Sequence, residues 1–133
     1  MKRFGVSLPD DLLKKFDGTI LKKGYANRSE ALRDLIRESL LKEQIESDDE
    51  IAGTLTLVYD HHTPDLSKKL DDIQHDHHNK VLSKLHIHLD HNNCLEVIVL
   101  KGKRSEIQAM ADAMVALRGV NHGKLTFTLT GNK

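Results

Sequence analysis

The sequence is poor in the features that mark secreted and membrane proteins. It has one cysteine and no tryptophan in 133 residues, so no disulfide can form within the chain, and a reducing compartment such as the cytoplasm is expected. No apolar run approaches the roughly 18 to 20 residues that cross a bilayer, which predicts neither a membrane span nor a membrane partner. The opening Met-Lys-Arg-Phe-Gly lacks the apolar core of a signal peptide.

Net charge is also missing, because 20 Lys and Arg residues offset 20 Asp and Glu residues. The balance hides two different segments. Residues 1–46 carry ten basic and eight acidic side chains, whereas residues 47–133 carry ten and twelve. Between them, residues 47–52 suit a short linker, since the stretch from Ser47 to Glu50 is polar and acidic. A neutral chain is not a general polyanion binder, but this balance is compatible with a locally basic surface.

The first segment predicts a strand followed by two helices. Residues 3–8 alternate between polar and apolar side chains, which indicates a strand. A helix then begins at Pro9, followed by two acids, and ends at Gly24. A second helix begins at the capping-box-like sequence 27–30 and continues to about residue 46.

A strand and two helices of this size bury too little apolar surface to fold alone, so an obligate dimer is expected. Two antiparallel strands would then form a ribbon that fits the DNA major groove and shows Arg3, Gly5 and Ser7 twice on its outer face. The free N–H groups at the start of the second helix form a natural phosphate anchor. The predicted DNA contacts at this end are Asn27, Arg28, Ser29 and Arg33.

The second segment predicts a ferredoxin-like βαββαβ sandwich, with two helices on one face of an antiparallel sheet. The expected elements are a strand over 54–59, a helix from near Pro64, strands over 81–89 and 94–100, a helix over 107–117 and a final strand over 123–129. The chain is therefore expected to be an α+β protein. Its parts are a DNA-binding domain over 1–46, the linker over 47–52 and a regulatory domain over 53–133.

Histidine is abundant, and all nine histidines follow residue 60. His86 and His88 share one face of the predicted strand, because side chains alternate along it. Cys94 follows across the turn, so one hairpin brings together two imidazoles and a thiol, a soft mixed N/S donor set. The alternative is an inert buried cysteine beside exposed polar histidines. Spacing alone leaves nickel, copper and zinc open.

His75 offers a fourth donor from the preceding helix. It lies roughly 200° around the helix from Ile73, at about 100° per residue, and therefore faces away from the buried stripe of that helix. Such a side chain reaches a neighbouring chain more easily than its own hairpin. The other histidines are first interpreted as ordinary surface residues, with weak, exchangeable metal sites at 61–62 and 77–78 as the alternative hypothesis.

Several motifs together carry a resemblance to a known family. Residues 2–8, 24–25 and 27–31 are similar to a ribbon-helix-helix DNA-binding domain. With residues 74–75, 85–88, 93–96 and 118–125, essentially the whole chain resembles the nickel-responsive transcriptional regulators, the NikR family. This resemblance implies a homotetramer, a dimer of dimers, with four ACT-like regulatory domains at its centre and a ribbon-helix-helix dimer at each end.

The resemblance also implies the metals and their ligands. One Ni²⁺ per chain would lie in a square plane formed by His86, His88 and Cys94 of one chain and His75 of another. Glu30 and Asp34 match acids that help to bind a second cation, for example K⁺, where the domains meet in the DNA complex. Without the resemblance, two acids one turn apart on a helix are usually solvated surface.

Two departures from the family bear on DNA binding. Gly5 stands at a base-reading position where relatives usually carry a hydroxyl, so it changes the operator preference that the resemblance implies. The loop 61–64 lacks the basic pair that some relatives place against DNA phosphates.

The combined pattern predicts a repressor that binds double-stranded operator DNA when nickel fills its site, and not an enzyme. The alternative is a nickel storage or delivery protein whose first segment only dimerises, or an antitoxin-type dimerisation element without metal response. A metallohydrolase is disfavoured, because four protein donors leave no open position for water and no general base accompanies them.

Overall fold

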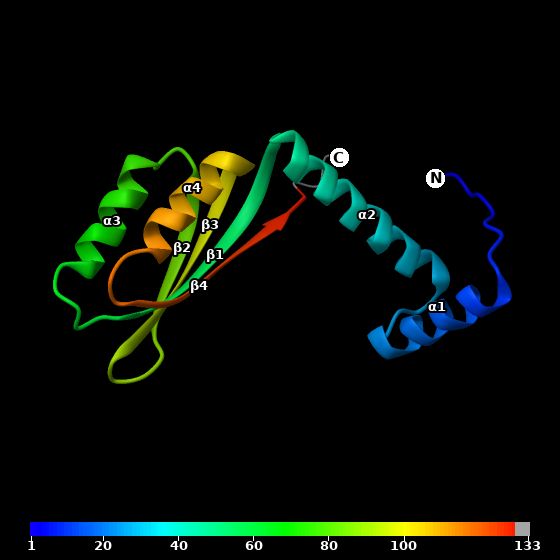
Figure 1. The fold of residues 1–133 in the computed structure, drawn as a ribbon, viewed down its shortest axis with the longest axis horizontal. Coiled ribbons are helices and arrows are strands. Elements are labelled where there is room, and N and C mark those ends of the chain that lie inside the picture. The colour runs from blue at the N-terminus through cyan, green and yellow to red at the C-terminus, as the bar shows by residue number, and fades with distance from the viewer. Residues whose placement is uncertain (130–133) are drawn as a thin grey trace. The chain divides into compact units, whose positions relative to one another are not determined.

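The computed structural model describes residues 1–129, which form two compact units, one over Met1–Ser39 and one from Leu40 onward. Figure 1 shows the elements in chain order. They are α1 (Asp10–Lys23), α2 (Arg28–Ser47), β1 (Glu50–Asp60), α3 (Leu66–Asp76), β2 (Val81–His88), β3 (Asn93–Lys103), α4 (Arg104–Val115) and β4 (Val120–Thr128). No helix in this part of the chain is long and apolar enough to cross a membrane.

Helices α1 and α2 begin and end within a residue of where the sequence predicts. Gly24 ends α1 in the left-handed conformation, with φ of 74°, which a glycine adopts without a steric penalty. Asn27 caps α2, since its Oδ1 accepts a hydrogen bond from the Glu30 N–H at 3.0 Å. Glu30 in turn accepts a bond from the Ala26 N–H at 3.4 Å, so the capping prediction is confirmed.

The strand predicted over residues 3–8 is not formed in the single chain, where residues 1–9 have no regular secondary structure. An isolated strand has no partner for its N–H and C=O groups, which explains the difference. Phe4 is 74% exposed and lines an apolar groove of about 390 Å³ in this unit. The rest of the groove is formed by Val6, Leu8, Leu12, Leu13, Phe16, Arg28, Leu32 and Leu35.

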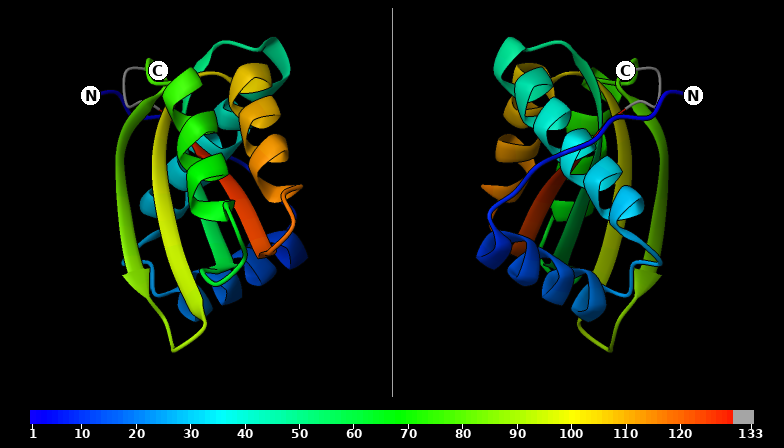
Figure 2. Two further views of the ribbon diagram at one scale, coloured as in Figure 1. Left: turned by 90° about the vertical axis from the view of Figure 1, so that its left-hand side faces the viewer. Right: turned by 90° about the vertical axis from the view of Figure 1, so that its right-hand side faces the viewer.

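The second unit is a four-stranded antiparallel sheet in the order β2-β3-β1-β4. Helices α3 and α4 lie side by side on one face of the sheet (Figure 2). This is the ferredoxin-like arrangement predicted from the βαββαβ order. Alternate side chains of β1, from Ile51 to Tyr59, point into the core between sheet and helices. Leu70 of α3 and Met110 of α4 close that core from the other side.

The connection between α2 and β1 is shorter than the predicted linker over 47–52. Helix α2 ends at Ser47 and β1 begins at Glu50, so only Asp48 and Asp49 lie between them. Asp48 has a φ of 59°. Its carboxylate accepts bonds from the backbone N–H and the hydroxyl of Ser105 at 2.7 and 2.6 Å, which caps α4. Residues 50–52, which were predicted to belong to the linker, therefore form the start of β1.

Candidate metal centre and DNA-binding surface

The candidate metal centre lies on the helix-covered face of the sheet, near the β2–β3 turn. Tyr59, Cys94 and His88 stand directly opposite one another on three neighbouring strands. Glu96 and His86 form the next cross-strand pair along the same face. Residues opposite each other in an antiparallel pair project to the same side, so both histidines share the side of the buried cysteine.

The structure brings Cys94 and His88 into contact. The Cys94 Sγ atom lies 3.4 Å from the His88 Nδ1 atom, and the ring centres of His86 and His88 are 5.6 Å apart. Cys94 is fully buried, whereas both imidazoles are exposed. A thiol and two imidazoles on one surface are suitable donors for a borderline transition metal.

The surroundings of Cys94 favour the protonated thiol. Burial raises the pKa of Cys94 above its ordinary value, and the nearby Glu96 and Asp90 carboxylates raise it further. Burial, followed by the charges of Glu96 and Cys94, also raises the pKa of Tyr59 to about 12. A metal ion that takes Cys94 as a ligand must therefore displace a proton.

His75 is separate from the hairpin donors. It lies in the last turn of α3 and is exposed, while the preceding Gln74 is buried. Within residues 1–129 of one chain, no three His, Cys, Asp or Glu side chains are placed so that they could hold a metal ion. His75 thus faces away from the core of its own unit, as the helical spacing predicts.

Further histidines gather beside the hairpin, which sequence spacing does not reveal. The His61 ring centre lies 5.5 Å from that of His88 and 4.0 Å from that of His62. The His61 Nε2 atom lies 2.7 Å from the carbonyl oxygen of His91. Pairing of β1 with β3 produces this cluster, because it aligns Asp60, next to His61, with Asn93 at the hairpin turn.

The predicted base-reading residues are all on the surface. Arg3, Gly5 and Ser7 are exposed, and an added Cβ at Gly5 would meet no atom within 4 Å. Ser29 and Arg33 at the start of α2 are also exposed. These positions are accessible to a large ligand such as DNA.

Arg28 differs from the other predicted DNA contacts because its guanidinium already has a partner. Its Nε and Nη2 atoms each lie 2.9 Å from a carboxylate oxygen of Asp17 on α1. This two-point ion pair joins the two helices of the unit. Sequence spacing does not reveal this pair, since the two residues are eleven positions apart on different helices.

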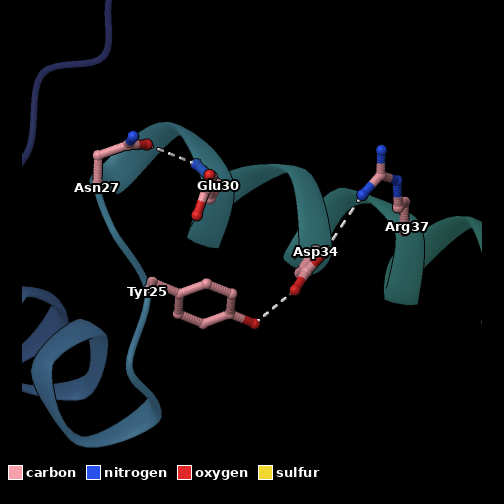
Figure 3. Close-up of polar contacts among 5 residues, drawn as sticks. All are labelled: Tyr25, Asn27, Glu30, Asp34 and Arg37. Atoms are coloured by element: carbon pink, nitrogen blue, oxygen red, sulfur yellow. Dashed lines mark hydrogen bonds and ion pairs between the residues drawn. The ribbon is translucent and has the colours of Figure 1, made fainter.

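The acids of the predicted second cation site have internal partners (Figure 3). Asp34 accepts a hydrogen bond of 2.6 Å from the Tyr25 hydroxyl and lies 3.4 Å from the Arg37 guanidinium. The Glu30 carboxylate accepts from the Ala26 N–H at the helix start. The pKa of Tyr25 is raised chiefly by its bond to Asp34. Asp34 is therefore more than a solvated surface acid.

Known protein families match both parts of the chain. Residues 52–128 match the NikR C terminal nickel binding domain, and residues 2–43 match the ribbon-helix-helix protein, copG family. The chain also resembles the structure of uncharacterized protein TM1266 from Thermotoga maritima. That match has a TM-score of 0.55 and 18% identity and covers 59% of this chain and 98% of that one, so it supports the fold alone.

Full-length relatives are similar over nearly the whole sequence. The chain is 56% identical over 132 residues to a protein of Geobacter sulfurreducens, and 57% identical over 131 residues to one of Desulfovibrio desulfuricans. Each match covers 98% of this chain and 95% of the relative, and both relatives carry the name "Putative nickel-responsive regulator".

These matches define a regulator with a ribbon-helix-helix domain followed by a regulatory α+β domain. The chain belongs to the family of nickel-responsive regulators. The resemblance drawn from the motifs is confirmed, and so is the expectation of a regulator of transcription instead of an enzyme.

Proposed function

We propose that this chain is a repressor that binds operator DNA when Ni²⁺ occupies a site shared between two chains. The observation that supports this most strongly is the placement of Cys94 and His88 at 3.4 Å, with His86 on the same face of the sheet. This donor set lies in the domain that matches a nickel-binding family, and the other domain matches a DNA-binding one.

His86, His88 and Cys94 of one chain and His75 of another would hold one Ni²⁺ per chain. Bound there, the ion supplies a link between two chains through four protein donors. Cys94 gives up its proton to become a ligand, and the exposed position of His75 on α3 leaves its imidazole free to enter a neighbour's site.

The proposed assembly is a homotetramer, a dimer of dimers. The groove lined by Phe4 in the first unit suits closure by a second copy. On the second unit, the sheet face opposite the helices exposes Leu85, Ile87 and Val99. Exposed apolar surface at two separate places is what a chain with two interfaces with its own copies would show.

DNA binding is assigned to the first domain, residues 1–46, which the short 47–52 segment joins to the regulatory domain over 53–133. In the dimer, residues 3–8 pair with those of the second copy, which places Arg3, Gly5 and Ser7 over the base edges. Asn27, Arg28, Ser29 and Arg33 at the start of α2 would contact phosphates. A protein that works on chromosomal DNA acts in the cytoplasm of its cell.

A second cation such as K⁺ is proposed at Glu30 and Asp34. Their oxygens are of the kind that hard cations prefer, and the Tyr25 hydroxyl holds the Asp34 carboxylate in place at 2.6 Å.

Metal uptake tests the proposed site directly. The freshly purified protein is titrated with nickel, and in parallel with copper and zinc, while absorbance and bound metal are followed. We expect about one nickel per chain and a thiolate-to-nickel absorption band. A protein that takes up no nickel, or takes it up without such a band, would contradict the proposal.

A further inference from the structure

A polar network with a buried centre and two exposed members, Lys84 and Asp71, joins α3 to strands β2 and β3 beside the candidate metal centre. Glu96 is only 3% exposed and Gln74 only 6%, and the Gln74 Nε2 atom donates to Glu96 Oε2 at 3.1 Å. The Lys84 ammonium lies 3.8 Å from the other Glu96 oxygen. It also donates to Asp71 Oδ1 at 3.1 Å.

Three of the four members of this network border a candidate metal ligand. Gln74 immediately precedes His75 in the last turn of α3. Glu96 stands directly opposite His86 across the β2–β3 pair. Residues two apart along a strand share a face. Glu96 lies two residues after Cys94 on β3, and Lys84 lies two residues before His86 on β2.

The network has a physical reason to be rigid. A buried carboxylate is costly unless it is paired and hydrogen-bonded, so Glu96 holds both Gln74 and Lys84 close. Gln74 and Asp71 belong to α3, whereas Lys84 belongs to β2 and Glu96 to β3. Loss of one partner would leave the carboxylate uncompensated and free α3 to shift on the sheet.

We infer that Lys84 and Glu96 are positioning residues for the nickel site. They fix the helix that carries His75 against the hairpin that carries His86, His88 and Cys94. In a shared site, each chain must present both its His75 and its hairpin across an interface with a neighbouring chain, so the spacing between the two within a chain sets the site geometry. This inference rests on the proposed function.

Nickel titration of full-length variants tests it, followed by the thiolate-to-nickel band at a temperature where circular dichroism shows every variant folded. Lys84→Met is expected to lower nickel affinity by roughly tenfold and to change the absorption band. Substitutions of residues that orient a metal ligand have effects of this size on metal affinity. Lys84→Arg keeps the cation and is expected to stay within about threefold of the unsubstituted protein.

Lys101→Met is the matched control. Lys101 is also a lysine in a strand paired with an acid, since its Nζ atom lies 3.5 Å from Glu50, but both side chains are exposed. This variant is expected to keep the affinity and the band of the unsubstituted protein. A loss as large as that of Lys84→Met would overturn the inference, since removal of any surface charge would then explain the effect.

The double variant Lys84→Met/Glu96→Leu separates positioning from simple stability. Replacement of an ion pair by apolar side chains restores stability in many proteins, but it does not tie α3 to the strands. The inference predicts that affinity stays reduced when stability returns. Affinity that recovers together with stability would overturn it.

The inference and the proposed function fail in different ways. Lys84→Met with unchanged affinity and band overturns the positioning role and leaves the nickel site intact. If the thiolate-to-nickel band is absent from the unsubstituted protein, or persists in Cys94→Ala, the proposed nickel site is wrong. The positioning role of Lys84 and Glu96 is then wrong as well.

Discussion

Cys94 and His88 face each other across the β2–β3 hairpin, with the thiol sulfur 3.4 Å from an imidazole nitrogen. Six residues separate them in sequence, and the strand pairing closes that gap. The register of the two strands alone therefore brings this pair of donors together.

Substitution of Cys94 by alanine removes the single thiol of the chain. We expect the thiolate-to-nickel absorption band to disappear. We also expect nickel affinity to fall by at least about 100-fold. Substitution of a residue that only supports a metal ligand already lowers metal affinity about 10- to 100-fold. Absorption titration checks both. His122→Ala is the control, since His122 is exposed on β4, and a loss of the band in that variant would place the site elsewhere.

The pH dependence of nickel binding follows from the raised pKa of Cys94. Below that pKa the thiol holds its proton, so each bound nickel releases one from this residue. Affinity is then expected to rise with pH by about tenfold per unit for this proton. Competition titrations at several pH values measure the slope. Equal slopes for the unsubstituted protein and Cys94→Ala would show that the thiol proton is not displaced.

Arg3→Ala tests the proposed reading surface. Loss of one guanidinium contact to a base edge is expected to weaken operator binding by about 1–3 kcal/mol, with nickel uptake unchanged. Gel shifts and metal titration on the same preparation measure the two effects. Lys124→Ala removes the same charge from β4 of the regulatory domain and is expected to leave both unchanged. An Arg3→Ala variant that binds its operator normally would favour a first domain that only dimerises.

Gly119 is predicted to be intolerant of a side chain. Its φ is 98°, and an added Cβ would collide with Thr63 and Leu66. Gly119→Ala is therefore expected to destabilise the fold by about 1–3 kcal/mol, measured by denaturant unfolding of the metal-free protein. Gly5→Ala is the control, because the space around Gly5 is open. Equal stability of the two variants would contradict this reasoning.

Local patterns predicted most of the fold. Gly24, the Asn27 cap and the helical and strand periodicities place the elements within a few residues. The βαββαβ order then indicated the ferredoxin-like sheet. Residues 3–8 are not a strand in a single chain, because the predicted strand needs a partner that only a second copy supplies.

The candidate site was predictable only where it depends on strand register. Alternation and one turn were enough to bring His88 to Cys94. The Arg28–Asp17 pair and the Gln74–Glu96 bond depend on how separate elements pack together, which short-range patterns do not contain. A single acid within an otherwise apolar strand was the one sequence signal for Glu96.

Nickel-dependent binding to operator DNA is measured by a gel shift of the metal-free and the nickel-loaded protein on its own upstream DNA. Salt concentration is held constant, since affinity for DNA varies steeply with it, and an unrelated DNA fragment serves as competitor. We expect a specific complex with the nickel-loaded protein and little or none without nickel. Equal binding in both states would contradict it.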